Sequence, residues 1–398
     1  MNPLEFLICL NADQSPADLE KIIAPFNARL GFKEHVNVHS IPWEDYRTEL
    51  TSVAIHNRGP DMSQVGAPLV SDLVAMNALR QFTAAEIAAL GGASAFVPVA
   101  WHSSMSVDKN QVWAIPWLAD PRAIYYWRDM LEKASLDEST AFQTFDHMQE
   151  TFQRLQASGV SSPWVIPTDY KLSILQTAVS WIWGAGGEII DEVQKTPLFH
   201  QPPALAGLHA YYGLYRYMPK ENQPLGFSQA FGLFANRQAA VTMGNLVPLL
   251  AFLKNASPDQ RARLGVAFPP GPSYVGGSSL VIWRHSIHDH TAVNLVNFLL
   301  SKDAQRDYCQ VIGYIPVRAD VLEEPPYSVD PILKGFVQSL HRGRIFPQVK
   351  MGGLIEERLS TALYMIWRAV ISNPQVDLEA AIQGQFEPII RRIESWIV

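Results

Sequence analysis

The stretch at 112–126, VWAIPWLADPRAIYY, contains two strand-like runs, with a proline inside the first. A central strand must donate amide hydrogens that proline lacks, so we expect the first run to end at Pro116 and the second to enter a different sheet. Trp117, Asp120 and Arg122 lie at this crossing. Charge beside a flat aromatic ring is typical of a site for a polar ligand. The alternative interpretation is an ordinary linker between domains, in which Asp120 and Arg122 form an ion pair on the surface.

Length and composition narrow the class of protein. A chain of 398 residues exceeds the size at which one hydrophobic core stops growing, so we expect two domains. The net charge is −7 and no basic block occurs, which argues against nucleic acid as a partner. The sequence contains 11 Trp and 13 Tyr, more than packing usually needs, which favours a binding surface for a partly apolar ligand.

The alternation of elements predicts the fold class. Strand-like and helical runs alternate over residues 4–66, which is typical of a parallel α/β sheet with crossovers. Ligands bind such sheets at the carboxyl ends of the strands. The prolines at 269–272 and the segment around Pro316 suggest two further changes of sheet. Three crossings predict two discontinuous α/β lobes, a three-segment hinge and a ligand cleft between the lobes.

Several segments, in a fixed order, carry a family resemblance. They are PDMSQVG at 60–66, DLVAMNAL at 72–79, the stretch at 112–126, RDMLEKA at 128–134, WGAGGEI at 183–189, AAVTMGN at 239–245, GGS at 276–278 and GYIPVR at 313–318. The ordered set resembles the extracellular solute-binding proteins of family 1, which include maltose-binding protein. The resemblance implies the periplasmic-binding-protein type II fold. It implies one lobe from 1–116 plus 276–314 and another from 117–275 plus 315–398.

The resemblance also implies sugars as ligands, and sugar recognition needs aromatic faces and planar hydrogen-bonding groups. Trp181 and Trp183 lie two apart on a predicted helix and cannot share a face, and we expect Trp183, beside Gly184, to reach the ligand. Core packing is the alternative role for any single aromatic residue. The candidate ligand-binding residues are Asp13, Gln14, Tyr46, Gly66, Trp117, Asp120, Arg122, Tyr170, Trp183, Asn245, Tyr274, Gly277 and Ser278.

The resemblance implies the function of a monomeric substrate-binding component of an ABC importer, which would bind a neutral saccharide and contact the importer's membrane subunits. No catalytic motif is recognised, and no catalytic residue, metal or cofactor is predicted. A glycosidase using Asp13 and Asp120 as a carboxylate pair is a weaker alternative.

The expected location is periplasmic or at the cell surface. No signal peptide is recognised at the start of the sequence, so we expect either that one was removed or that the protein is cytoplasmic. A cytoplasmic or receptor-linked sensor of a small polar solute is therefore a second hypothesis for the same fold.

Overall fold

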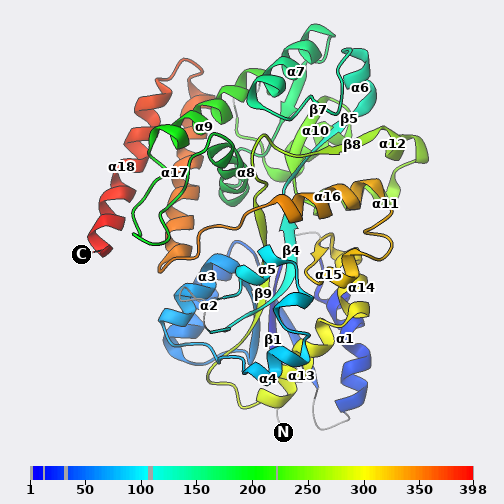
Figure 1. Ribbon diagram of the computed structural model, residues 1–398, viewed down its shortest axis with the longest axis vertical. Helices are drawn as coiled ribbons and strands as arrows, with labels where there is room; N and C mark the ends of the chain where they lie inside the picture. The colour runs from blue at the N-terminus through cyan, green and yellow to red at the C-terminus, as the bar shows by residue number, and fades with distance from the viewer. Residues whose placement is uncertain (1–2, 12–13, 31–34, 106–110, 221–222, 398) are drawn as a thin grey trace. The chain divides into compact units, whose positions relative to one another are not determined.

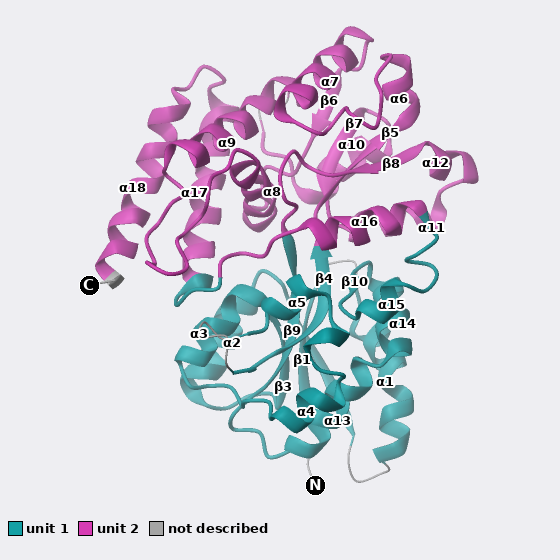
Figure 2. Cartoon of the chain, in the orientation of Figure 1, with its two compact units in different colours: residues 1–120, 275–330, 348–353 teal, residues 121–274, 331–347, 354–398 magenta. Residues whose placement is uncertain are grey.

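The computed structural model describes residues 3–11, 14–30, 35–105, 111–220 and 223–397 (Figure 1). The chain forms two compact units (Figure 2). Unit 1 consists of Met1–Asp120, Val275–Asp330 and Gln348–Gly353, and unit 2 consists of Pro121–Tyr274, Pro331–Pro347 and Leu354–Val398. Both units are therefore assembled from stretches that lie far apart in the sequence.

Unit 1 contains a six-stranded sheet with the order β10-β4-β9-β3-β1-β2. Its strands are β1 Leu4–Leu10, β2 Val36–Pro42, β3 Met62–Gly66, β4 Ile115–Pro121, β9 Val275–Ile282 and β10 Ile315–Pro316. Strand β1 pairs in parallel with β2 and β3, and β9 runs antiparallel to β3. The carboxyl ends of β1, β2 and β3 and the amino end of β9 therefore share one edge of the sheet.

The helices of unit 1 begin where the sequence offers start signals. Pro16 opens α1, and Thr83 caps α4 through a capping box with Glu86. The helical elements are α1 Pro16–Leu30, α2 Tyr46–His56, α3 Ala67–Ala75, α4 Ala84–Ala89, η1 Ala93–Ala95, α5 Pro98–His102, α13 Asp289–Leu299, α14 Lys302–Ile312 and α15 Ala319–Leu322.

Unit 2 contains a four-stranded sheet with the order β6-β7-β5-β8. Its strands are β5 Ala123–Trp127, β6 Ser162–Val165, β7 Ala239–Gly244 and β8 Leu264–Ala267. Strands β6 and β7 are parallel, whereas β5 runs antiparallel to both β7 and β8. One edge of this sheet therefore collects the carboxyl ends of β6, β7 and β8 and the amino end of β5.

Helices make up most of the remainder of unit 2. They are α6 Arg128–Lys133, α7 Phe145–Ala157, α8 Lys171–Gly184, α9 Pro202–Gly213, η2 Leu214–Tyr217, α10 Phe227–Ala235, α11 Leu246–Asn255, α12 Pro258–Arg263, α16 Pro331–Arg342, α17 Gly352–Ser372 and α18 Leu378–Ile397. Helix α16 packs closely on β8, because a Cβ atom at Gly335 would lie 2.7 Å from the Cγ1 atom of Val266. This docking joins a late segment of the chain to the sheet.

The change of sheet in 112–126 occurs later than predicted. Strand β4 does not end at Pro116 but continues to Pro121, and the chain then enters β5 of the other sheet. Its partner β10 pairs only with Leu118 and Ala119, beyond the proline, so the missing amide costs no bond to β10.

The boundaries of the two units differ from the predicted boundaries of the two lobes. The first two divisions fall after Asp120 and Tyr274, close to the predicted ones after 116 and 275. The third falls after Asp330, so the predicted boundary after 314 comes too early. The reason is that β10 is a strand of the unit 1 sheet, where Ile315 pairs with Ala119 of β4. Gln348–Gly353 also belongs to unit 1, although it was predicted in the other lobe.

Candidate functional site

In unit 1, polar side chains connect the strands at the edge where β1, β2 and β3 end. The buried Gln64 side chain accepts a hydrogen bond from the Cys9 amide at 2.9 Å and donates one to the Ser278 hydroxyl at 2.9 Å. Gly66, the last residue of β3, lies opposite Ser278 in the register. The structure thus brings together two residues that the sequence predicted separately. Gln64, which was not predicted, holds this edge in place.

An aromatic pair follows β2 at the same edge. The rings of Trp43 and Tyr46 lie 5.3 Å apart between centroids in a T-shaped arrangement. Tyr46 is buried, whereas Trp43 is partly exposed. A side chain at position 66 would meet the Tyr46 hydroxyl at 3.2 Å, so Gly66 leaves room for the phenol. Trp43 was not predicted, although its position directly after a strand was a usable signal.

A charged pair lies beside these rings. The Arg47 guanidinium carbon is 5.7 Å from the centroid of the Tyr46 ring, and Arg47 Nη1 is 3.9 Å from Asp72 Oδ2. The Arg47 side chain is 20% exposed and the Asp72 side chain 19% exposed. Asp72 therefore offsets the positive charge of Arg47, and the guanidinium is attracted to the face of the Tyr46 ring.

Other predicted residues of unit 1 have structural roles. The Gln14 side chain accepts a hydrogen bond from the Asn11 amide at 2.9 Å and donates one to the Ile312 carbonyl at 3.0 Å. Trp117 is fully buried and stacks on Tyr308 at 5.2 Å, so it fills the core instead of reaching a ligand. Asp13 lies outside the described residues.

Two more predicted residues lie near the divisions between the units. Asp120 is buried and ends the first segment of unit 1. Gly277 has a φ of +133°, and a Cβ atom there would overlap the carbonyl oxygen of Leu118. The absence of a side chain at Gly277 thus allows its backbone to pack closely against that of Leu118.

In unit 2, three predicted residues lie at the edge where β6 and β7 end. Tyr170 is half-buried and precedes the first residue of α8. Asn245 is buried and precedes α11. Arg122 is buried just before β5, and its guanidinium donates a hydrogen bond to the side chain of Gln176. The predicted strand ends therefore do gather polar side chains here.

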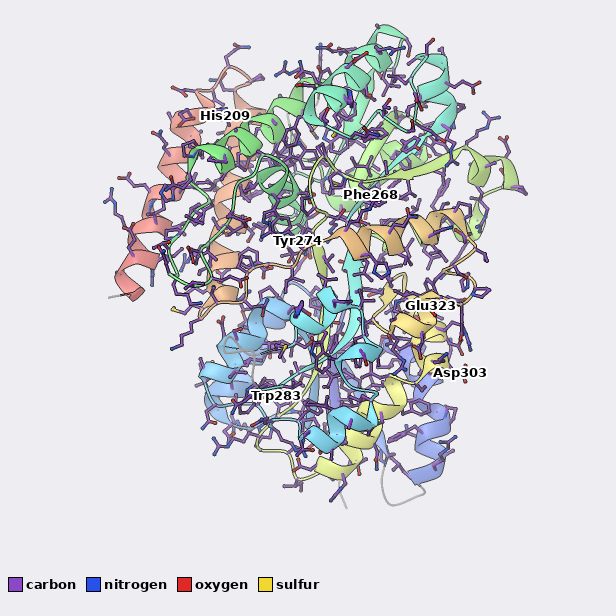
Figure 3. The ribbon with its side chains drawn as sticks, in the orientation of Figure 1. His209, Phe268, Tyr274, Trp283, Asp303 and Glu323 are labelled. Atoms are coloured by element: carbon purple, nitrogen blue, oxygen red, sulfur yellow. The ribbon has the colours of Figure 1, made fainter. Side chains whose placement is uncertain are left out.

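One aromatic pair of unit 2 consists of Trp183 and Tyr274, the latter labelled in Figure 3. Their rings are nearly parallel, with an interplanar angle of 6° and centroids 6.4 Å apart. The Arg344 guanidinium lies 4.8 Å from the centroid of Trp183 and forms two hydrogen bonds with Glu188, at 3.0 and 2.8 Å. The Tyr274 hydroxyl donates to the buried Glu356 carboxylate at 3.3 Å.

Trp183 and its neighbour Trp181 differ in their surroundings. Trp181 packs in the core against Trp164 and Tyr211, with centroids 6.1 and 5.5 Å away. Among the described residues, the buried indole nitrogen of Trp183 has no hydrogen-bond partner. The buried indole nitrogens of Trp43, Trp113 and Trp164 likewise have no partner among the described residues, so the Trp183 nitrogen is one of four such donors. Arg344 and Glu188 were missed because they lie far apart in the sequence.

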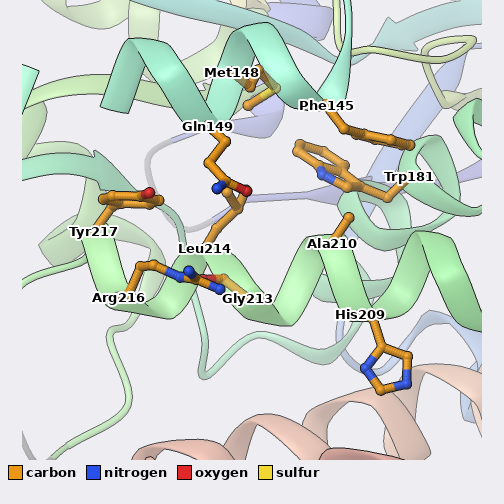
Figure 4. A pocket seen from close by; sticks show the side chains of 10 residues that line it. All are labelled: Phe145, Met148, Gln149, Trp181, His209, Ala210, Gly213, Leu214, Arg216 and Tyr217. Atoms are coloured by element: carbon orange, nitrogen blue, oxygen red, sulfur yellow. The ribbon is translucent and has the colours of Figure 1, made fainter. Parts of the chain in front are cut away.

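A hollow lies on the helical part of unit 2, between α7, α9 and η2 (Figure 4). It encloses about 390 Å³ including its open mouth, and Trp181 and Tyr217 are among its lining residues. It contains no predicted ligand-binding residue.

Two further observations on the described residues concern metal-binding groups and membrane-spanning helices. Within the ranges described above, no group of three or more His, Cys, Asp or Glu side chains is placed to hold a metal ion. The helices in those ranges include none that is long and apolar enough to cross a membrane.

Both the fold and the sequence of this chain are similar to those of known proteins. The sugar-binding protein MalE of Xanthomonas citri superposes with a TM-score of 0.83 over 100% of this chain and 99% of that chain, at 19% identity. The chain therefore has the mixed α/β, two-sheet fold of MalE-type periplasmic binding proteins. Residues 21–335 match the bacterial extracellular solute-binding proteins. This protein belongs to that family.

Two curated relatives agree with this assignment. A binding protein of Brucella abortus (strain 2308) is 23% identical over 393 residues, which cover 91% of each chain. The maltotriose-binding protein of Pyrococcus abyssi is 20% identical over 309 residues, which cover 72% of this chain and 61% of the relative.

Proposed function

We propose that this protein binds a neutral saccharide and delivers it to the membrane subunits of an ABC importer. The observation that carries the proposal is the cluster in unit 2 of the buried rings of Trp183 and Tyr274 with the guanidinium of Arg344. The pair of Trp43 and Tyr46 is its counterpart in unit 1. The names of the relatives from Xanthomonas citri and Pyrococcus abyssi support a sugar as the ligand.

The chemistry of these two groups of side chains suits a sugar. Aromatic faces accept the apolar C–H patches of a pyranose ring, while indole N–H and hydroxyl groups bond its hydroxyls. Arg344 is neutralised by Glu188, and Arg47 lies near Asp72. An anionic solute would have to compete with these carboxylates for the guanidinium groups, so a neutral ligand is favoured.

The remaining parts of the proposal concern the setting of the protein. We infer a periplasmic or cell-surface location, a monomeric state and a non-catalytic role from the family. A ligand that binds one conformation of the protein more tightly than another would shift the population toward that conformation, which is the one that the importer would recognise.

Isothermal titration calorimetry tests the proposal with maltose, maltotriose and tagatose as probes. We expect at least one to bind, and Trp183→Phe to weaken that binding about tenfold through loss of the indole N–H and ring area. Trp181→Phe, two residues along the same helix, is the matched control and should leave the affinity within about twofold. Failure of all neutral sugars, with binding of glycerol 3-phosphate instead, would contradict the proposal.

The sensor hypothesis can be separated from the importer hypothesis by location. Cell fractionation of the native organism, followed by immunodetection, should find the protein outside the cytoplasmic membrane. Recovery in the cytoplasmic fraction alone would favour the sensor.

A further inference from the structure

Three stretches of unit 2 lie beside the divisions between the units. The first two are the start of the segment Pro121–Tyr274, at Arg122, and its end, at Ser273 and Tyr274. The third is the segment Pro331–Pro347, called the inserted segment below. We propose that Ser339, in the inserted segment, is a positioning residue whose hydroxyl fastens these three stretches together. The bonds involved all lie within unit 2.

The hydroxyl of Ser339 lies at the centre of a buried hydrogen-bonded chain. Its Oγ atom is 2.6 Å from the carbonyl oxygen of Arg122 and 2.7 Å from the Oγ atom of Ser273. A hydroxyl has one hydrogen to donate. The Ser339 hydrogen must go to the Arg122 carbonyl, which can only accept, so the Ser273 hydroxyl donates to Ser339. Both serines are almost fully buried, so water does not compete for these bonds.

Backbone hydrogen bonds extend the connection in each direction. The Arg122 amide donates to the Tyr274 carbonyl at 2.9 Å, and the Arg344 amide donates to the Ser273 carbonyl at 2.8 Å. The Tyr274 amide donates to the Ser180 hydroxyl of α8 at 3.1 Å. Each of the three stretches is thus bonded to another, and the set is anchored to a helix of unit 2.

The side chains held in this way include those of the candidate site. Arg122 and Tyr274 lie at the strand-end edge, and Arg344 covers the ring of Trp183. Helix α16 is itself fixed by the close packing of Gly335 on Val266. Ser339 therefore transmits the position of α16 to the residues proposed to bind the solute. Only this last consequence rests on the proposed function, because the hydrogen-bonded junction exists whichever solute binds.

The first test needs no ligand. Amide hydrogen exchange of the full-length Ser339→Ala variant, followed by mass spectrometry, should show about tenfold faster exchange in three peptides, around Arg122, Tyr274 and Arg344. Thr151→Val is the matched control, because its buried hydroxyl also donates to a backbone carbonyl, that of Ala141 at 2.9 Å, but within α7 and its neighbouring loop. The control should leave the three peptides unchanged.

The outcome of this test is decisive in either direction. Faster exchange in all three peptides together supports the junction. Faster exchange confined to α16, or spread evenly over unit 2 as in global destabilisation, overturns it. Ser273→Ala removes the neighbouring hydroxyl and should reproduce the pattern around Tyr274, which gives a second variant if Ser339→Ala folds poorly.

The second test measures the affinity for maltotriose of the same variants. Ser339→Ala should weaken binding about tenfold, whereas Thr151→Val should not, even if both lower the melting temperature equally. An unchanged affinity in Ser339→Ala would overturn the positioning role. Absence of maltotriose binding by the wild-type protein would count against the proposed ligand, and the exchange experiment would still decide the junction.

Discussion

Gly277 shows how a single residue can restrict the chain at a division between segments. Its φ of +133° lies in the region that favours glycine, and a side chain there would overlap the Leu118 carbonyl. Gly232 in α10 differs in both respects, because its φ is ordinary and a Cβ atom there would point into open space. The backbone conformation and packing at position 277 therefore require glycine, whereas position 232 has room for a side chain.

We expect Gly277→Ala to lower the free energy of unfolding by about 2 kcal/mol or more, from backbone strain and steric overlap. Gly232→Ala should instead raise it by about 0.5–1 kcal/mol, the gain of alanine over glycine in a helix. Urea titration followed by circular dichroism measures both. Equal effects of the two substitutions would show that the strand at Gly277 adjusts freely.

The aromatic residues show what sequence reasoning can establish at this scale. It expected Trp181 and Trp183 to face different surroundings, because helical geometry puts residues two apart on different faces, and their ring neighbours do differ. The role of Trp183 in ligand binding stays a prediction. Sequence reasoning failed for Trp117, because a strand residue in a fully buried sheet faces protein on both sides and alternation carries no signal. It also missed Arg344 and Glu188, whose pairing depends on folding across 156 positions.

At the level of elements, one carboxylate joins three parts of unit 2. Asp129 in α6 bonds Arg237 at 2.6 Å, in the turn after α10, and Arg263 at 2.9 Å, at the end of α12. Burial opposes ionisation of Asp129, yet the hydrogen bonds from Arg237 and Arg263 outweigh it and lower the pKa of the carboxyl group. The ionised form therefore stabilises the packing of these helices.

The stability contributed by Asp129 should depend on pH. Its lowered folded pKa means that the contribution is complete above the unfolded pKa of about 3.9 and is lost as the pH falls through the folded value. We expect Asp129→Asn to cost about 1–2 kcal/mol at pH 7 and progressively less as the pH falls below the unfolded pKa, by urea titration at each pH. Glu387→Gln, from an exposed pair with Arg391, should cost less than about 0.5 kcal/mol throughout. A cost for Asp129→Asn that does not change with pH would contradict this origin.

The elements themselves were largely predictable, with instructive exceptions. The strands and helices of residues 4–66 follow from alternation and helical periodicity. Helix α16 was not predicted, although Ile332, Phe336 and Leu340 recur at intervals of four and are buried. The two-residue strand β10 could not be foreseen, because its pairing with β4 is what makes it a strand.

For the whole molecule, the main consequence of the fold is that neither unit is continuous in the sequence. The chain passes between the units after Asp120, Tyr274, Asp330, Pro347 and Gly353. Unit 2 draws part of its core from its last segment, where the Trp367 indole donates to the Tyr211 hydroxyl at 3.1 Å and the Leu363 carbonyl accepts from Tyr212 at 2.8 Å.

The isolated fragment 121–274 should therefore fail to fold. It contains all four strands of its sheet but lacks α16 and α17, which cover β8 and the tyrosines of α9. We expect far-ultraviolet dichroism without a cooperative thermal transition. A control chain that joins 121–274, 331–347 and 354–398 through flexible linkers should regain that transition. A cooperative transition in the fragment alone would mean that the later segments are dispensable.

The short return of the chain to unit 1 at Gln348–Gly353 has a consequence for the surroundings of one charged pair. Both of its flanks belong to unit 2, and a Cβ atom at Gly353 would collide with the side chains of Arg47 and Asp72. The loop thus lies against the charged pair next to Tyr46. A change in the length of this loop would therefore alter the surroundings of Arg47 and Asp72 without altering any strand.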